Sequence, residues 1–244
     1  MQSLLKDIVS HTNKLGFLNT VKVTGTDEKT LIDSMADDRS VIMFAETATP
    51  YPTLSGTFGM PQLEKLRYLI DGSEYQDNAK IELVTAQRNG EDVPTGLHFE
   101  NKDGDFKNDY RFMSTDMINE KLKTVKFNGV KWDVTIEPTV SAIQRFQFQA
   151  GANTEHTNFL PKIIGNNLVF TFGDAASHAG EFVFAAGVTG KITKAWTYPI
   201  NAVLSILKIA DANNTKMSFS DGGALKLELD SGIATYQYII PANV

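Results

Sequence analysis

Short runs that alternate apolar and polar residues, each closed by a tight-turn pair, constrain this chain more than any other feature. Examples are 80–84, with the sequence KIELV, and 224–229, with the sequence ALKLEL. Turn pairs such as Asp103-Gly104 and Asn128-Gly129 separate the runs. A period of two puts successive side chains on opposite faces of a strand, and these pairs tolerate the positive φ of tight hairpins. The sequence therefore predicts sheets that are mostly antiparallel.

Four segments depart from this alternation and follow the period of an amphipathic helix. Three of them come after a strand and a proline, namely Pro61, Pro138 or Pro199. We place each proline at the first helical position, where its missing amide proton costs nothing. A few helices among many hairpins favour an α+β fold with the helices gathered on one sheet face. The predicted helices span about 3–15, 61–71, 139–150 and 199–212.

The order of elements nearly repeats itself along the chain. Helix, strands, helix and strands follow one another up to residue 114, and a similar order begins at residue 133. We therefore predict two similar domains, 1–114 and 133–244, joined by a charged connector at 115–132 that lacks a clear period. The apolar residues of the connector either pack on the sheet beneath or line a docking groove. They are Ile118, Leu122, Val125 and Phe127.

Composition limits the functions that this chain can have. Acidic residues outnumber basic ones by 29 to 23, and a formal net charge of −6 gives no general affinity for a polyanion. A length of 244 residues with 42% hydrophobic residues supports substantial cores. The absence of cysteine excludes disulfides and fits a reducing cytoplasm. No signal peptide and no apolar run of ~18 residues occurs, so we expect a soluble, intracellular protein without a membrane partner.

Motifs for catalysis and metal binding are absent from the sequence. The four histidines, His11, His98, His156 and His178, are scattered and form no HExxH pair. No glycine-rich phosphate loop occurs, and the segment 101–105 resembles a calcium loop that lacks its closing glutamate. We therefore expect no catalytic residue, no metal and no cofactor, in a protein that is not an enzyme.

Positive charge lies on the outward faces of the predicted helices. Serine, asparagine and glutamine fill the rest of these faces, while the helical acids Asp7, Glu64, Asp71 and Asp211 lie mainly toward the helix ends. Two interpretations remain open: ordinary solvated faces, which any amphipathic helix shows, or a basic surface assembled by the fold. The bases are Lys6, Lys14, Lys65, Arg67, Arg145 and Lys208.

The C-terminal part of the chain carries a family resemblance. An apolar helix at 202–210 is followed by strands at 215–220, 224–229 and 234–242. This succession resembles the closing helix and hairpin of the sliding clamps of DNA replication, of the proliferating cell nuclear antigen (PCNA) type. The segment 108–113 is similar to the strand before the connector of that family, and 134–138 to the strand and proline that open its second domain. The shortness of the chain and its helical N-terminus are most similar to the clamps of large tailed phages.

The resemblance implies both a fold and a function. The fold is α+β, with two similar DNA-clamp domains, each with two helices packed on antiparallel sheets, forming a ring as a homotrimer. Such a ring encircles double-stranded DNA without sequence specificity and tethers the replicative DNA polymerase, which raises processivity; a clamp loader is a further partner. In a phage, late-transcription factors are also expected partners. The implied location is the host cytoplasm for a phage-encoded chain and the nucleus for a cellular eukaryotic one.

The same resemblance implies roles for particular residues. Helices line the hole, so Lys6, Lys14, Lys65, Arg67, Arg145 and Lys208 would contact DNA. Subunits join edge to edge, with 109–114 of one chain against 168–173 of the next. A partner peptide inserts between the connector and the C-terminal tail. The implied interface residues are Tyr110, Phe112, Leu168, Val169 and Phe170, and the implied partner-binding residues are Leu122, Val125, Phe127, Ile239, Ile240 and Pro241.

The main alternative is a non-enzymatic viral structural or assembly protein, whose hairpins serve assembly and whose helices only pack. An uncharacterised hydrolase is a third possibility. The mass of the purified protein separates the first two, because a closed ring predicts a trimer.

Overall fold

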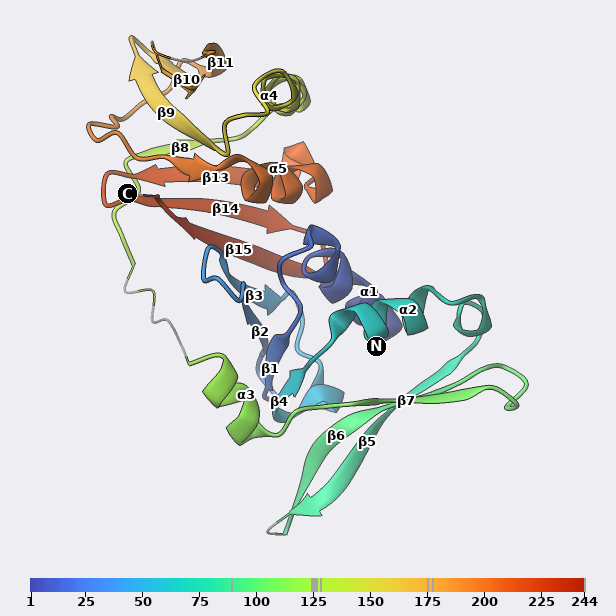
Figure 1. The fold of residues 1–244 in the computed structure, drawn as a ribbon. Helices are drawn as coiled ribbons and strands as arrows, with labels where there is room; N and C mark the ends of the chain where they lie inside the picture. Colours follow the sequence, from blue (N-terminus) through green and yellow to red (C-terminus); the bar gives the residue numbers. More distant parts are fainter. Residues whose placement is uncertain (89, 124–126, 128, 175, 177, 244) are drawn as a thin grey trace. The chain divides into compact units, whose positions relative to one another are not determined.

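The computed structural model describes residues 1–88, 90–123, 127, 129–174, 176 and 178–243 (Figure 1). The chain divides into two compact units. Unit 1 comprises Met1–Lys126 with Gly232–Thr235, and unit 2 comprises Phe127–Ser231 with Tyr236–Val244. The division falls within the segment 115–132.

Unit 1 contains a pair of helices, α1 and α2, that pack against each other, and two groups of antiparallel strands. One group has the order β4-β1-β2-β3 and the other the order β5-β6-β7. A short helix, α3, follows β7 and contacts β4. The bounds are α1 Gln2–Ser10, β1 Val21–Gly25, β2 Thr30–Met35, β3 Ile42–Thr47, β4 Gly56–Met60, α2 Leu63–Asp71, β5 Lys80–Arg88, β6 Glu91–Glu100, β7 Lys107–Arg111 and α3 Thr115–Lys121.

Unit 2 has a similar plan, in which helices α4 and α5 pack against each other. Its strands follow the orders β15-β14-β13-β8 and β11-β10-β9-β12. The pairs with a described register are antiparallel. The bounds are β8 Val134–Ile136, α4 Val140–Ala152, β9 Asn158–Ile164, β10 Asn167–Phe172, β11 Gly180–Ala186, β12 Tyr198–Pro199, α5 Ile200–Ile209, β13 Thr215–Ser220, β14 Ala224–Asp230 and β15 Ala234–Pro241.

Each core follows from the period of its elements. In β1 the residues Val21 and Val23 are fully buried while the lysine between them is half-buried, as a period of two requires. The first helix buries Leu4, Leu5 and Ile8 at helical spacing. Burial of one such aliphatic side chain contributes about 1.5–3 kcal/mol. The alternation and the helical period thus define the core of unit 1.

The core of unit 2 is aromatic. Phe146 of α4 is fully buried, and its ring lies 4.9 Å from that of Phe159 in β9 and 5.2 Å from that of Phe170 in β10. The rings of Phe182 and Phe184 in β11 lie 6.3 Å and 6.2 Å from it. These distances are within the range in which aromatic pairs attract one another. A single helical side chain thus anchors α4 on three strands.

The predicted α+β class, with antiparallel sheets and a packed pair of helices in each half, is confirmed. No helix in the described part of the chain is long and apolar enough to cross a membrane.

The prediction that proline occupies the first helical position is wrong. Pro61 precedes Gln62, the residue before α2, which has a left-handed φ of 51°. Pro138 precedes Thr139, whose hydroxyl accepts a hydrogen bond from the Ala142 amide at 3.1 Å and so caps α4. Pro199 is the residue immediately before α5. The prolines therefore end the preceding segment, and other residues begin the helices.

Two further differences concern helix extent. The first predicted helix ends at Ser10, and a separate 3₁₀ turn, Asn13–Leu15, follows it. Within the predicted connector, α3 was not expected. Ser114 begins it, since its hydroxyl accepts from the Met117 amide, and Ile118 packs so closely on β4 that a Cβ at Gly59 would lie 2.7 Å from its Cδ1. Of the two interpretations of the connector, packing on strands therefore holds for Ile118.

Candidate nucleic-acid interface and peptide groove

The helices of unit 1 carry four of the predicted DNA-binding residues. Lys14 and Lys65 are exposed, whereas Lys6 and Arg67 are half-buried. Lys6 lies on α1, and its Nζ donates to Gln76 Oε1 at 3.1 Å. Lys65 and Arg67 lie on α2 and line one groove beside β7. Three of the four bases thus lie on a single pair of packed helices, while Lys14 lies in the 3₁₀ turn after α1.

The helices of unit 2 carry the other two. Lys208 lies on the exposed face of α5 and forms no ion pair with a described residue. Arg145 of α4 is also exposed, but its guanidinium is engaged: Nη1 donates to the Val183 carbonyl at 3.2 Å, and Cζ lies 5.3 Å from the centre of the Phe182 ring. Arg145 is therefore directed toward β11, whereas Lys208 projects from its helix.

Of the two segments predicted to join subunits, one lies at a sheet edge and the other does not. In the order β5-β6-β7, β7 lies at an edge. In the order β11-β10-β9-β12, β10 lies between two partners, and its backbone pairs with both of them. The segment 168–173 therefore cannot supply an edge; β11 is the edge strand on that side. The predicted interface residues Leu168, Val169 and Phe170 are all buried in unit 2.

The aromatic residues predicted for the other edge are also engaged inside their own unit. Tyr110 is buried, and its hydroxyl donates to the Pro61 carbonyl. Burial raises the pKa of this phenol. The ring of Phe112 stacks on that of Phe58 at 4.4 Å. A strand that paired with β7 would therefore bind the backbone of β7 rather than the side chains of Tyr110 and Phe112.

A small groove of about 30 Å³ lies between the end of α3 and the outward face of β1, β2 and β3. Leu122, a predicted partner-binding residue, lines it. Sequence reasoning missed its other apolar residues, although they occupy the face opposite the core in strands 30–35 and 42–47. The lining residues are Lys22, Asp33, Ser34, Met35, Ile42, Phe44, Leu122 and Lys123.

One acid lies in this apolar groove. Asp33 of β2 is opposite Lys22 of β1 and Phe44 of β3. Burial raises the pKa of the Asp33 carboxyl above its ordinary value, and the positive charge of Lys22 partly offsets this shift. The groove thus combines apolar side chains with an incompletely solvated charge, as peptide-binding sites often do.

Four other predicted partner-binding residues are described, and none of them is among the lining residues of this groove. Phe127 is half-buried, and its ring stacks on Trp132 at 6.1 Å. Ile239 and Ile240 of β15 are buried in the core, so neither is exposed to a partner in the chain alone. Pro241 is exposed. Val125 lies outside the described residues.

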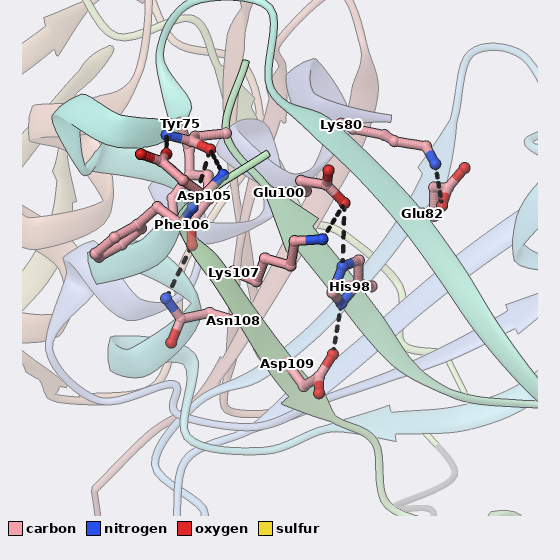
Figure 2. Close-up of polar contacts among 11 residues, drawn as sticks. Tyr75, Lys80, Glu82, His98, Glu100, Asp105, Phe106, Lys107, Asn108 and Asp109 are labelled. Carbon is pink, nitrogen blue, oxygen red and sulfur yellow. Dashed lines mark hydrogen bonds and ion pairs between the residues drawn. The ribbon is translucent and has the colours of Figure 1, made fainter. Parts of the chain in front are cut away.

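The outward face of β5, β6 and β7 carries charges of alternating sign (Figure 2). His98 Nδ1 lies 2.8 Å from Asp109 Oδ1, and Lys107 Nζ lies 3.3 Å from Glu100 Oε2. The hydrogen bond from His98 holds the pKa of Asp109 below its ordinary value, and the hydrogen bond from Lys107 does the same for Glu100. Over the described ranges, no three acidic or histidine side chains are placed to hold a metal ion. This cluster is an ion-pair network.

The comparisons with known proteins concern the fold. No protein-family model and no curated protein matches the sequence. Among solved structures, the fold is that of PCNA-type sliding clamps. A structure described as the C-terminal region of FEN-1 bound to A. fulgidus PCNA is 9% identical, with a TM-score of 0.69 over 100% of this chain and 95% of that one. PCNA from Thermococcus kodakaraensis is 11% identical, with a TM-score of 0.68 over 98% of this chain and 97% of that one.

Proposed function

We propose that this chain is the subunit of a DNA sliding clamp, a homotrimeric ring that encircles duplex DNA and tethers the replicative polymerase. One observation carries the proposal: the whole chain follows the fold of PCNA-type clamps from end to end. The protein hydrolyses nothing in this role. It acts by keeping a polymerase close to its template, so that retention comes from topology rather than from tight binding.

The distribution of charge supports this role. An acidic chain has no general attraction for DNA, yet Lys65 and Lys208 project from the helices of the two units. Cations that contact phosphates attract DNA regardless of its sequence, and without contacts to base edges they set no preferred position. A sparse set of lysines therefore suits a ring that slides. Lys6, Lys14 and Arg67 complete this set. Arg145 is the member least available to bind phosphate, because its guanidinium already contacts Val183 and Phe182.

The edge strands support a ring. In the proposed trimer, β7 of one chain pairs with β11 of the next, which replaces the pairing with 168–173. Both strands leave one side of their backbone available in the chain alone, and pairing removes edges that would otherwise favour aggregation. The two edges differ, so the contact is head-to-tail; such contacts close into a ring when the rotation between copies closes, and otherwise give open filaments.

The groove below α3 is proposed to bind a short apolar peptide of a partner protein. Its lining of Met35, Ile42, Phe44 and Leu122 supports an extended or single-turn segment with apolar anchors. The DNA polymerase and the clamp loader are the proposed partners. As part of the same proposal, a phage-encoded ring also serves late transcription in the host cytoplasm, and a cellular eukaryotic one works in the nucleus.

Light scattering of the purified protein tests the ring. The expected mass is three times the 26.9 kDa of the chain, independent of concentration above the dissociation constant. Open polymers that grow with concentration, or a monomer at high concentration, contradict the ring and favour the structural-protein alternative.

Polymerase processivity tests the DNA-facing surface. A triple variant, Lys6→Glu, Lys14→Glu and Lys208→Glu, should abolish loader-dependent processivity while the trimer persists. A control variant changes three exposed lysines away from the helices, Lys29→Glu, Lys162→Glu and Lys216→Glu, and alters the net charge equally. Equal losses in both variants would show that net charge, and not the helix surface, governs DNA binding.

A further inference from the structure

The two most exposed large hydrophobic side chains of the described chain are both aromatic and both lie on helices. Tyr68 of α2 is 80% exposed and Phe148 of α4 is 74% exposed. Neither side chain contributes to the core of its own unit. Exposed aromatic residues that project from rigid elements are typical anchors of protein interfaces. The question is which surface each one meets.

Tyr68 lies beside the free edge of β7. It lines an open groove together with Phe106, itself 47% exposed, and Asn108 of β7. This Tyr68 groove is held in shape by side chains from the adjacent hairpin. Asn108 Nδ2 donates to Tyr75 Oη at 2.8 Å, and the Asn101 Oδ1 accepts from the Phe106 amide at 3.1 Å (Figure 2). The groove is therefore preformed and continuous with an edge strand.

Phe148 lies on α4, the helix that packs against β11, the other edge strand. Arg145, three residues earlier on α4, donates to Val183 of β11. Gly180 of β11 is so close to α4 that a Cβ there would lie 2.7 Å from Gln149 Oε1. The shallow hollow at Phe148 is lined by amides and small residues, and the charged side chain of Arg145 is directed away from it toward β11. This Phe148 patch consists of Gln144, Gln147, Phe148, Gly151 and Ala152.

We propose that the Phe148 patch of one copy packs into the Tyr68 groove of the next copy, beside the β7–β11 pair; this inference rests on the proposed ring. The two sites are unlike, so the contact is head-to-tail, as a closed ring requires. Each site belongs to elements that adjoin an unpaired strand edge. A single contact between two copies could therefore bury the two sites and pair the two edges.

The polar groups of the two sites also fit. The rim of the Tyr68 groove holds both signs of charge, Lys65 and Arg67 with Asp71 and Glu74. A patch with a single sign of charge would repel the rim residues of the same sign. The glutamine amides of the Phe148 patch can donate to the acids and accept from the bases, so no charge needs to be buried unpaired.

Cross-linking between introduced cysteines tests the contact directly, because the chain contains no cysteine of its own. A variant with both Tyr68→Cys and Phe148→Cys, treated with a short bismaleimide, should give covalent dimers and trimers on a denaturing gel. Either single-cysteine variant, treated in the same way, should run as a monomer on the denaturing gel. Sedimentation of the same samples before treatment reports whether the ring is present.

The outcomes separate this inference from the proposed function. A sedimenting trimer without cross-links, or a link within one chain, overturns the Phe148–Tyr68 contact and leaves the ring intact. A monomer at all concentrations overturns both.

Alanine variants provide a second test. Tyr68→Ala and Phe148→Ala should each weaken trimer association about tenfold or more, and the double variant should lose less than the product of the two. Ile164→Ala removes another exposed apolar side chain, outside both sites, and should leave association unchanged. A Tyr68→Ala trimer of normal stability that binds DNA poorly would instead assign Tyr68 to the DNA surface and refute the contact.

Discussion

Replacing Phe146 with alanine should lower the free energy of unfolding of unit 2 by about 4 kcal/mol. Truncating a buried phenylalanine typically costs about 3–5 kcal/mol, through lost transfer energy and the cavity left behind. Phe146 belongs in the upper part of this range because it is fully buried and its ring meets those of β9, β10 and β11. The loss is large compared with the ~5–15 kcal/mol that stabilises a typical domain.

Tryptophan fluorescence during urea unfolding measures this effect selectively. Both tryptophans of the chain, Trp132 and Trp196, belong to unit 2. With an m-value of ~2 kcal/mol/M, a loss of about 4 kcal/mol moves the midpoint to lower urea by ~2 M. Hydrogen exchange should rise first in α4, since Phe146 is the side chain that anchors this helix.

Val140→Ala is the matched control. Val140 lies at the start of the same helix and is exposed. It should change the free energy of unfolding by no more than ~0.5 kcal/mol. If Phe146→Ala cost less than ~1.5 kcal/mol, α4 would be held by other contacts, and the aromatic account of unit 2 would be refuted.

Three further predictions concern charge. Arg145→Lys keeps the charge but loses the bond to Val183 and the stacking on Phe182, so trimer association measured by sedimentation should weaken as in Arg145→Gln. Normal association of the Arg145→Lys variant would show that the charge, and not these two contacts, is what matters. Lys65→Ala removes three cations from a trimer, so the slope of log K against log salt for a short duplex should fall by ~1–3, whereas Lys216→Ala should leave it unchanged. The hydrogen bond from Thr193 lowers the pKa of Asp221, so this carboxylate stabilises the fold above its unfolded pKa of ~3.9, and the contribution disappears as pH falls through the lower folded value. In Asp221→Asn, the melting temperature should therefore fall less steeply with pH below about pH 4 than in the unaltered protein. An equally steep fall would contradict this.

The strands were predictable because their signal is local. A period of two is a property of a few consecutive residues, and it placed Val21 and Val23 correctly in the core. The position of a strand within its sheet is not local, and here the prediction failed for 168–173. A clue was available, since three consecutive apolar residues, Leu168 to Phe170, are buried together, which is typical of an interior strand.

The candidate surfaces were predictable only in part. Helical periodicity correctly placed Lys65 and Lys208 on exposed faces. It could not show that Arg145 turns toward Val183, which is 38 residues away in the sequence. The sequence pointed to the proposed peptide groove through Leu122 alone, because Met35 and Phe44 become neighbours of Leu122 only when the sheet and α3 have formed.

The unlike edges β7 and β11 have a consequence for direction. In the proposed ring every subunit offers β7 to one neighbour and β11 to the other, so no two-fold axis relates the top of the ring to its bottom. The ring therefore has a front and a back, and all three peptide grooves open with the same orientation. A polymerase bound through such a groove would meet the DNA from one side only, and a ring loaded the wrong way round would carry its enzyme facing away from the primer end.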